Sequence, residues 1–163
     1  QRYYKMIYRD AFGRLEDFSE KTFEALYPLA EKENPSNPDI TYAQYLLSWV
    51  QTFNYQRAGN INDPDFTSPL AAICGQGNDC DSRSMLLSIL LNSIDVESIL
   101  LFSIDYSHAM AATNIKAPGQ TYKLEENQKE YIFGETTDNV TWGMIVQDQS
   151  DRSKWIPVTF FQD

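Results

Sequence analysis

A turn of small and acidic residues leads directly into an apolar run in the segment GNDCDSRSMLLSILL (residues 77–91). This order is typical of the start of a buried helix, with Asn78 or Asp79 available as the N-cap. Cys80 would then lie in the first turn, where free backbone N–H groups and the helix dipole favour a thiolate. The segment therefore predicts a helix from Cys80 to about Asn92 that begins with a candidate nucleophile.

Two further candidate catalytic residues follow Cys80 along the chain. His108 is the only histidine, and it opens an expected strand. Glu135 lies near the end of another expected strand, where alternation places it on the same face as Phe133. A neighbouring strand that carries His108 would bring the imidazole and this carboxylate together. Cysteine, histidine and carboxylate in this order suggest a nucleophile, a base and a residue that orients the base.

The same residues also have structural interpretations. A cysteine in an apolar helix is commonly an inert buried thiol, and a lone histidine is commonly a structural residue. Cys74 and Cys80 are the only cysteines, and in an oxidising compartment they could close a short disulfide that would disable the thiol. One histidine and two cysteines make a poor ligand set for zinc, so a zinc enzyme is not expected.

Length and composition fit one domain with its own core. The chain has 163 residues, of which 42% are hydrophobic, so it is expected to fold. Its net charge is −10, from 23 acidic and 13 basic residues, and nucleic-acid binding is not expected because phosphates would be repelled. No apolar run is long enough to span a membrane. We expect a single domain over 1–163, with 1–40 as an N-terminal helical extension and 41–163 as the core.

Helical periodicity dominates the first third of the chain. It predicts one helix over about 8–29, ended by Pro28 and a loop at 33–38, and a second from about 39 to 53. Residues 54–79 are expected to form a long irregular loop. Apolar and β-branched runs then predict strands at 96–104, 108–115, 131–136 and 156–160. Helices followed by antiparallel strands indicate an α+β fold.

Three motifs in this order resemble the transglutaminase-like superfamily. Residues 78–87 are similar to its Gly-Asp-Cys-Glu/Asp-x-x-x-Leu-Leu segment, residues 108–110 to its histidine strand, and residues 131–137 to the strand with its acidic member. The resemblance covers about residues 41–145 and is closest to the bacterial transglutaminase-like cysteine peptidases. It implies a papain-like fold in which the nucleophile helix packs on an antiparallel sheet.

The resemblance implies a cysteine protease or amidase with Cys80, His108 and Glu135 as its triad. Cys80 would attack a peptide or amide carbonyl, and His108 would protonate the leaving amine. The acyl-enzyme would then meet water, giving hydrolysis, or an amine, giving crosslinking by an acyl transferase. A non-catalytic binding domain on the same scaffold is the other alternative. Gln76 is a candidate oxyanion donor beside the Cys80 backbone N–H.

Some positions depart from the family pattern. Asn78 replaces the usual glycine, although asparagine tolerates left-handed backbone angles better than most residues. Met110 stands where many relatives have tryptophan. Glu135 stands where many have aspartate, and its longer side chain can still reach an imidazole. Asp138 is a weaker candidate for the orienting role, because it lies beyond the strand end.

Asp79 and Asp81 flank the nucleophile and form a candidate calcium site. Some bacterial relatives need calcium, and hard oxygen ligands suit it; the simpler interpretation is capping at a solvated helix start. Two like charges beside Cys80 would also raise the pKa of its thiol, against the helix dipole. No other cofactor is expected. The resemblance further implies a protein or peptide substrate and an extracytoplasmic location, in the periplasm or at the cell surface.

Overall fold

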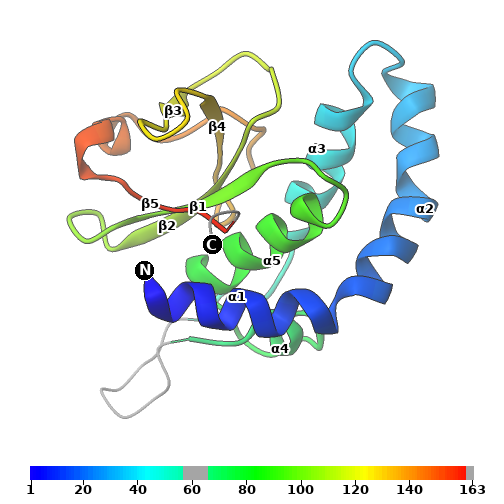
Figure 1. Cartoon of the computed structure of the whole chain (residues 1–163), viewed down its shortest axis with the longest axis horizontal. Coiled ribbons are helices and arrows are strands. Elements are labelled where there is room, and N and C mark those ends of the chain that lie inside the picture. The colour runs from blue at the N-terminus through cyan, green and yellow to red at the C-terminus, as the bar shows by residue number, and fades with distance from the viewer. Residues whose placement is uncertain (57–65, 161–163) are drawn as a thin grey trace.

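Helices precede strands along the chain, as expected for an α+β fold. The structure is a computed structural model that describes residues 1–56 and 66–160. The helices are α1 (Arg2–Arg14), α2 (Glu16–Glu33), α3 (Pro38–Gln51), α4 (Pro69–Ile73) and α5 (Cys80–Asn92). The strands are β1 (Ser98–Ser103), β2 (His108–Thr113), β3 (Thr121–Lys123), β4 (Glu130–Gly134) and β5 (Ile156–Val158), and two 3-10 turns, η1 (Gln147–Gln149) and η2 (Arg152–Lys154), precede β5 (Figure 1). None of the described helices is long and apolar enough to span a bilayer.

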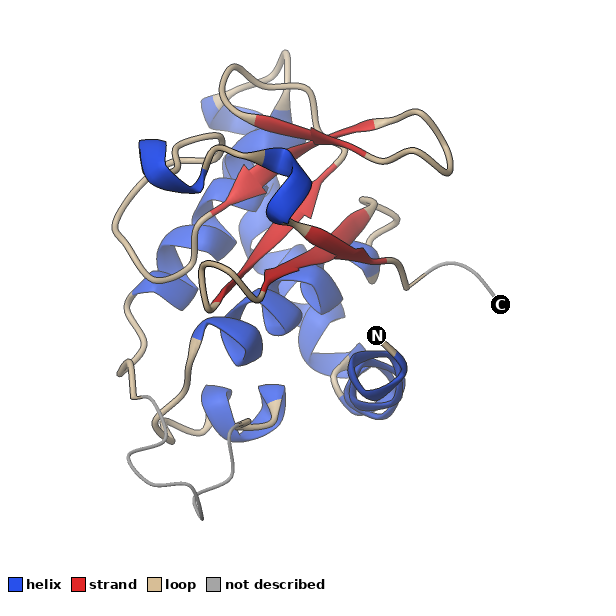
Figure 2. Ribbon diagram, turned by 90° about the vertical axis from the view of Figure 1, so that its left-hand side faces the viewer, coloured by secondary structure: helices blue, strands red, loops and turns tan. Residues whose placement is uncertain are grey.

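The strands form one antiparallel sheet in the order β3-β4-β2-β1-β5. β1 and β2 are joined as a hairpin that pairs Ser103 with His108. β4 lies on the other side of β2 and pairs Gly134 with Ala111. Figure 2 shows the long helices gathered on one side of this sheet. The nucleophile helix α5 packs on β1 and β2, which confirms the predicted arrangement of helix on sheet.

The helix α5 is buried along almost its whole length, because the other helices and the sheet enclose it. Its leucine side chains share a core with α1, α2 and α3, and each such buried side chain contributes about 1.5–3 kcal/mol of stability. Its small polar residues fasten it to the sheet. Ser84 and Ser88 donate to backbone carbonyls of Ala109 and Ile99, and Asn92 accepts the Ser98 N–H at 2.6 Å. These bonds fix the position of α5 on the sheet, and with it the position of Cys80 relative to β2.

The predicted single first helix is wrong in three respects, the first being that helical structure begins at Arg2 rather than near residue 8. The helix breaks at Leu15, whose backbone is not helical, and α2 continues through Pro28 to Glu33. A proline inside a helix removes one hydrogen bond and costs about 3 kcal/mol. Packing offsets this cost, because Tyr27 contacts Tyr42 on α3 and its hydroxyl donates to Asp39 at 2.7 Å. At this position, the contacts with α3 therefore outweigh the tendency of proline to end a helix.

Two short elements lie where irregular chain was expected. The expected loop at 54–79 contains α4, which Ser68 caps by accepting the Ala71 N–H at 3.2 Å. Residues 57–65 of that loop lie outside the described residues. β3 is a three-residue strand that lies at the edge of the sheet, as far as residues 1–56 and 66–160 show, and pairs with β4. Strands as short as β3 carry too few residues for alternation to be visible in the sequence.

Candidate active site

The start of α5 is fixed by a side-chain cap. Asp79 Oδ1 accepts the Ser82 backbone N–H at 3.1 Å and its hydroxyl at 2.9 Å, so Asp79, rather than Asn78, is the N-cap. Cys80 is the first residue of the helix and is only 4% exposed. The thiol therefore lies where unpaired helix N–H groups favour its charged form, as the sequence predicted.

Cys80 packs in a small buried cluster with Leu100, Ala109 and Val158. Ala109 directly follows His108 on β2, so the thiol lies beside the strand that carries the histidine. Cys74 is exposed at the end of α4, and both cysteines are reduced thiols. The Cys74–Cys80 disulfide that would disable the nucleophile is therefore not formed.

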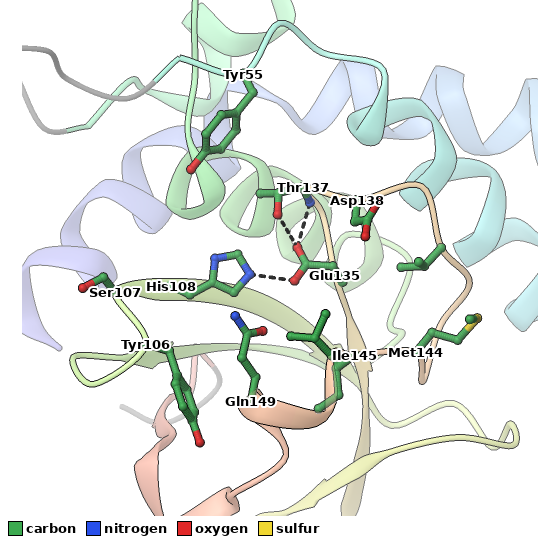
Figure 3. A pocket seen from close by; sticks show the side chains of 12 residues that line it. Tyr55, Tyr106, Ser107, His108, Glu135, Thr137, Asp138, Met144, Ile145 and Gln149 are labelled. Atoms are coloured by element: carbon green, nitrogen blue, oxygen red, sulfur yellow. Dashed lines mark hydrogen bonds and ion pairs between the residues drawn. The ribbon is translucent and has the colours of Figure 1, made fainter.

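His108 and Glu135 form a hydrogen-bonded pair. Continued by one residue beyond β4, the antiparallel register of β2 with β4 sets Glu135 opposite Met110, two residues from His108 and on the same face of the sheet. His108 Nε2 lies 2.7 Å from Glu135 Oε2, and each side chain is 10% exposed (Figure 3). Because Nε2 is used in this bond, Nδ1 is the nitrogen left to face a thiol.

The other oxygen of the Glu135 carboxylate is also held. Its Oε1 accepts from the Thr137 backbone N–H at 2.8 Å and from the Thr137 hydroxyl at 2.7 Å. Asp138, the weaker candidate for orienting the histidine, is exposed, and its carboxylate accepts the Asn139 N–H instead. Of the two acidic candidates, Glu135 is the one that contacts His108.

Buried Glu135 and partly buried Asp81 have opposite pKa shifts. Burial alone would raise the pKa of Glu135, but the hydrogen bond and charge of His108, with the bonds from Thr137, hold it below its ordinary value of 4.5. Burial raises the pKa of Asp81, and the hydrogen bond from Tyr4 and the nearby His108 only partly oppose this. Asp81 Oδ2 accepts from the Tyr4 hydroxyl at 2.7 Å, and its Oδ1 lies 3.7 Å from Cys80 Sγ. Glu135 is therefore a stabilised anion, whereas ionised Asp81 is costly.

Arg83 is a site residue that the sequence analysis missed. Its side chain is 1% exposed, and burial lowers its pKa against the raising effect of nearby negative groups. The guanidinium donates to three oxygens: Asn78 Oδ1 at 2.6 Å, Phe53 O at 2.6 Å and Thr136 O at 3.0 Å. It therefore ties the start of α5 to the end of α3 and to the residue after Glu135. A charged residue inside an apolar helix was the available signal.

The remaining candidate site residues are Asp79, Asp81 and Gln76, and each either forms hydrogen bonds within the protein or is exposed. Asp79 Oδ1 belongs to the helix cap and Asp81 Oδ2 to Tyr4. Within residues 1–56 and 66–160, no three His, Cys, Asp or Glu side chains are arranged to hold a metal ion. Gln76 is exposed in the loop before α5, and its role as an oxyanion donor stays a prediction.

A cavity of about 450 Å³ opens beside the His108–Glu135 pair. Figure 3 looks into it and shows the histidine at its wall. Most of the remaining wall comes from the segment between β4 and β5 and from two tyrosines. The lining residues are Tyr55, Tyr106, Ser107, His108, Glu135, Thr137, Asp138, Val140, Met144, Ile145, Val146 and Gln149. The pair therefore faces a space that can hold part of a substrate.

Solved structures of LapG from Legionella pneumophila are similar to this chain. One, described as EGTA-treated, has a TM-score of 0.50 at 15% identity and covers 90% of this chain and 79% of the LapG chain. Another, described as calcium-bound, has a TM-score of 0.47 at 16% identity, with 91% and 81% covered. No protein-family model and no curated protein sequence matches the chain. The α+β fold matches the transglutaminase-like fold of LapG, as the sequence resemblance implied.

Proposed function

We propose that this chain is a thiol-dependent hydrolase of peptide or amide bonds, with Cys80, His108 and Glu135 as its triad. The observation that carries the proposal is the 2.7 Å hydrogen bond between His108 Nε2 and Glu135 Oε2. Ala109, the residue that follows His108 on β2, packs in one buried cluster with the helix-start thiol of Cys80. The transglutaminase-like fold shared with LapG supports the same assignment.

In this mechanism, His108 Nδ1 takes the thiol proton and Cys80 Sγ attacks the carbonyl carbon. The Cys80 backbone N–H donates to the resulting oxyanion, and Gln76 is the proposed second donor. The imidazolium then gives its proton to the leaving amine, and water hydrolyses the remaining thioester. Glu135 stabilises the imidazolium and fixes which ring nitrogen faces the thiol.

Calcium has no role in this proposal. Asp79 Oδ1 caps the helix, and the two oxygens of Asp81 accept from the Tyr4 hydroxyl and the Cys80 thiol, so most of the carboxylate oxygens of the pair are already engaged. Calcium takes about 6–8 oxygen ligands. Because the described residues supply no larger cluster, they do not fit the ion, and no step is assigned to it.

The same proposal names the partner and the location. A protein or peptide substrate and an extracytoplasmic site of action follow from the resemblance to transglutaminase-like peptidases. The net charge of −10 disfavours nucleic acid as a partner, because a phosphate backbone would be repelled.

Hydrolysis of an internally quenched peptide library tests the proposal on wild type, Cys80→Ala and Cys74→Ala. We expect wild type and Cys74→Ala to cleave equally, and Cys80→Ala to lose about 10³-fold or more of the rate, because the nucleophile is removed. Full activity in Cys80→Ala would contradict the proposal. Transfer of product onto an added primary amine, monodansylcadaverine, would instead identify an acyl transferase. Inactivity of all three proteins would favour a binding scaffold.

A further inference from the structure

The cavity beside His108 has an apolar rim that is open to solvent. Val140, Met144, Ile145 and Val146 supply it from the segment that follows β4. Met144 and Val146 are 54% and 55% exposed, which places them among the few large apolar side chains on the described surface. Apolar groups that surround a cavity next to reactive residues are typical of a ligand site.

Two residues that line the cavity, Tyr106 and Gln149, each have a buried polar atom with no hydrogen-bond partner among the described residues, and the Gln149 carboxamide is the one that faces the histidine (Figure 3). Gln149 Oε1 is buried and accepts no hydrogen bond from the described residues. Figure 3 shows its carboxamide directed toward His108. The Trp155 indole N–H donates to the Gln149 backbone carbonyl at 2.9 Å, which fixes the position of this residue. A buried acceptor is normally satisfied, and a peptide N–H in the cavity would satisfy this one.

The charge of the wall restricts what can enter. Its acidic members are Glu135 and Asp138, and none of the described lining residues is lysine or arginine. Glu135 is paired with His108, whereas Asp138 is exposed. An acidic side chain would meet an uncompensated carboxylate, while an apolar side chain would bury the rim.

We propose that this cavity is the substrate subsite next to the scissile bond, that it accepts an apolar side chain and rejects an acidic one, and that Gln149 accepts a substrate backbone N–H there. The inference rests on the proposed hydrolase function and deepens it by naming the substrate class. A volume of about 450 Å³ is within the usual range for a small-ligand pocket.

The test uses internally quenched peptides in which each position flanking the scissile bond is set in turn to Leu or Glu. Wild type is expected to prefer Leu over Glu by about tenfold or more in kcat/KM at one position. Met144→Lys places a cation in the rim that would attract the Glu side chain, so the preference for Leu over Glu should fall about tenfold. Leu29→Lys is the matched control, because Leu29 on α2 is equally exposed, at 54%, and it should keep the wild-type preference.

Gln149→Ala separates binding from chemistry. Loss of the acceptor should raise KM about tenfold, with a smaller effect on kcat, and leave alkylation of Cys80 by iodoacetamide unchanged. If wild type cleaves Leu and Glu peptides equally, or if Met144→Lys and Leu29→Lys show the same preference, the subsite is overturned while the hydrolase stands. If wild type cleaves no peptide and Cys80 is inert, both proposals fail.

Discussion

At the scale of residues, the surroundings of Cys80 combine three carboxylates with one buried guanidinium. Asp79 caps the helix, Asp81 lies 3.7 Å from the thiol, and Glu135 is bonded to His108. Arg83 is the cation among them. The sequence raised the conflict between like charges and the helix dipole. The structure separates the three acids by role, since the partly buried Asp81 is the one whose carboxylate contacts Sγ.

Asp81→Asn should make Cys80 more reactive and the protein more stable at neutral pH. The amide still accepts the Tyr4 hydroxyl, but the negative charge beside the thiol is gone, so the pKa of the thiol should fall by about 1 unit. Because burial raises the pKa of Asp81, its ionised form destabilises the fold above that pKa, and the variant removes this cost. Alkylation rates against pH and urea unfolding at pH 7 measure both effects. An unchanged alkylation profile would show that Asp81 does not act on the thiol.

In the Glu135→Gln variant, the free energy of unfolding should decrease less steeply with falling pH than in wild type. The folded-state pKa of Glu135 lies below 4.5, so its ionised form stabilises the fold above that value, and this contribution is lost as pH falls through the folded pKa. The glutamine amide binds no proton in this pH range, so the variant lacks this contribution to acid unfolding. At neutral pH it should be less stable by about 1.5–3 kcal/mol, because a charged hydrogen bond is lost. Urea unfolding at several pH values between about 3 and 7 should therefore give a shallower slope for the variant than for wild type.

At the scale of elements, α5 was predictable because its signals are local. The Asp79 cap, the apolar run and the length of the helix all lie within residues 79–92. By contrast, β3 is defined by its pairing with β4, and α2 continues through Pro28 because of α3. The packing of α1 beside Cys80 could not be predicted from local sequence either. Tyr4 packs on the cluster around Cys80 and donates to Asp81, and burial raises the pKa of Tyr4 so that it remains a donor.

Arg83→Met should destabilise the fold strongly, because Arg83 joins α5 to α3 and to the chain after β4. Removing the guanidinium leaves two buried acceptors and one partly buried acceptor without their donor, at an expected cost of about 3–5 kcal/mol in urea unfolding. Arg14→Met is the control, since Arg14 forms an exposed ion pair with Asp10 and should change stability by less than about 1 kcal/mol. Arg83→Lys covers the case in which the first variant does not fold. Equal changes in the free energy of unfolding for Arg83→Met and Arg14→Met would show that Arg83 does not hold these segments together.

At the scale of the whole molecule, the candidate site is assembled from segments far apart in the chain. The sheet order places β2 between β1 and β4, which brings His108 to Glu135, while α5 carries Cys80 to β2. Residue types and their order were enough to nominate these three. They were not enough to find the cavity, because most of its wall depends on the path of the chain after β4, which no local pattern encodes. The role of Arg83 was visible only as a charged residue inside an apolar helix, because its three partners come from separate segments.

The most direct test of the triad is the pH dependence of Cys80 alkylation by iodoacetamide, measured in a Cys74→Ser background so that one thiol reports. If His108 activates the thiol, Cys80 should react well below the ordinary thiol pKa of about 8.5, and His108→Ala should abolish the reactivity at low pH. A single titration near 8.5 that is the same with and without His108 would contradict the proposed active site.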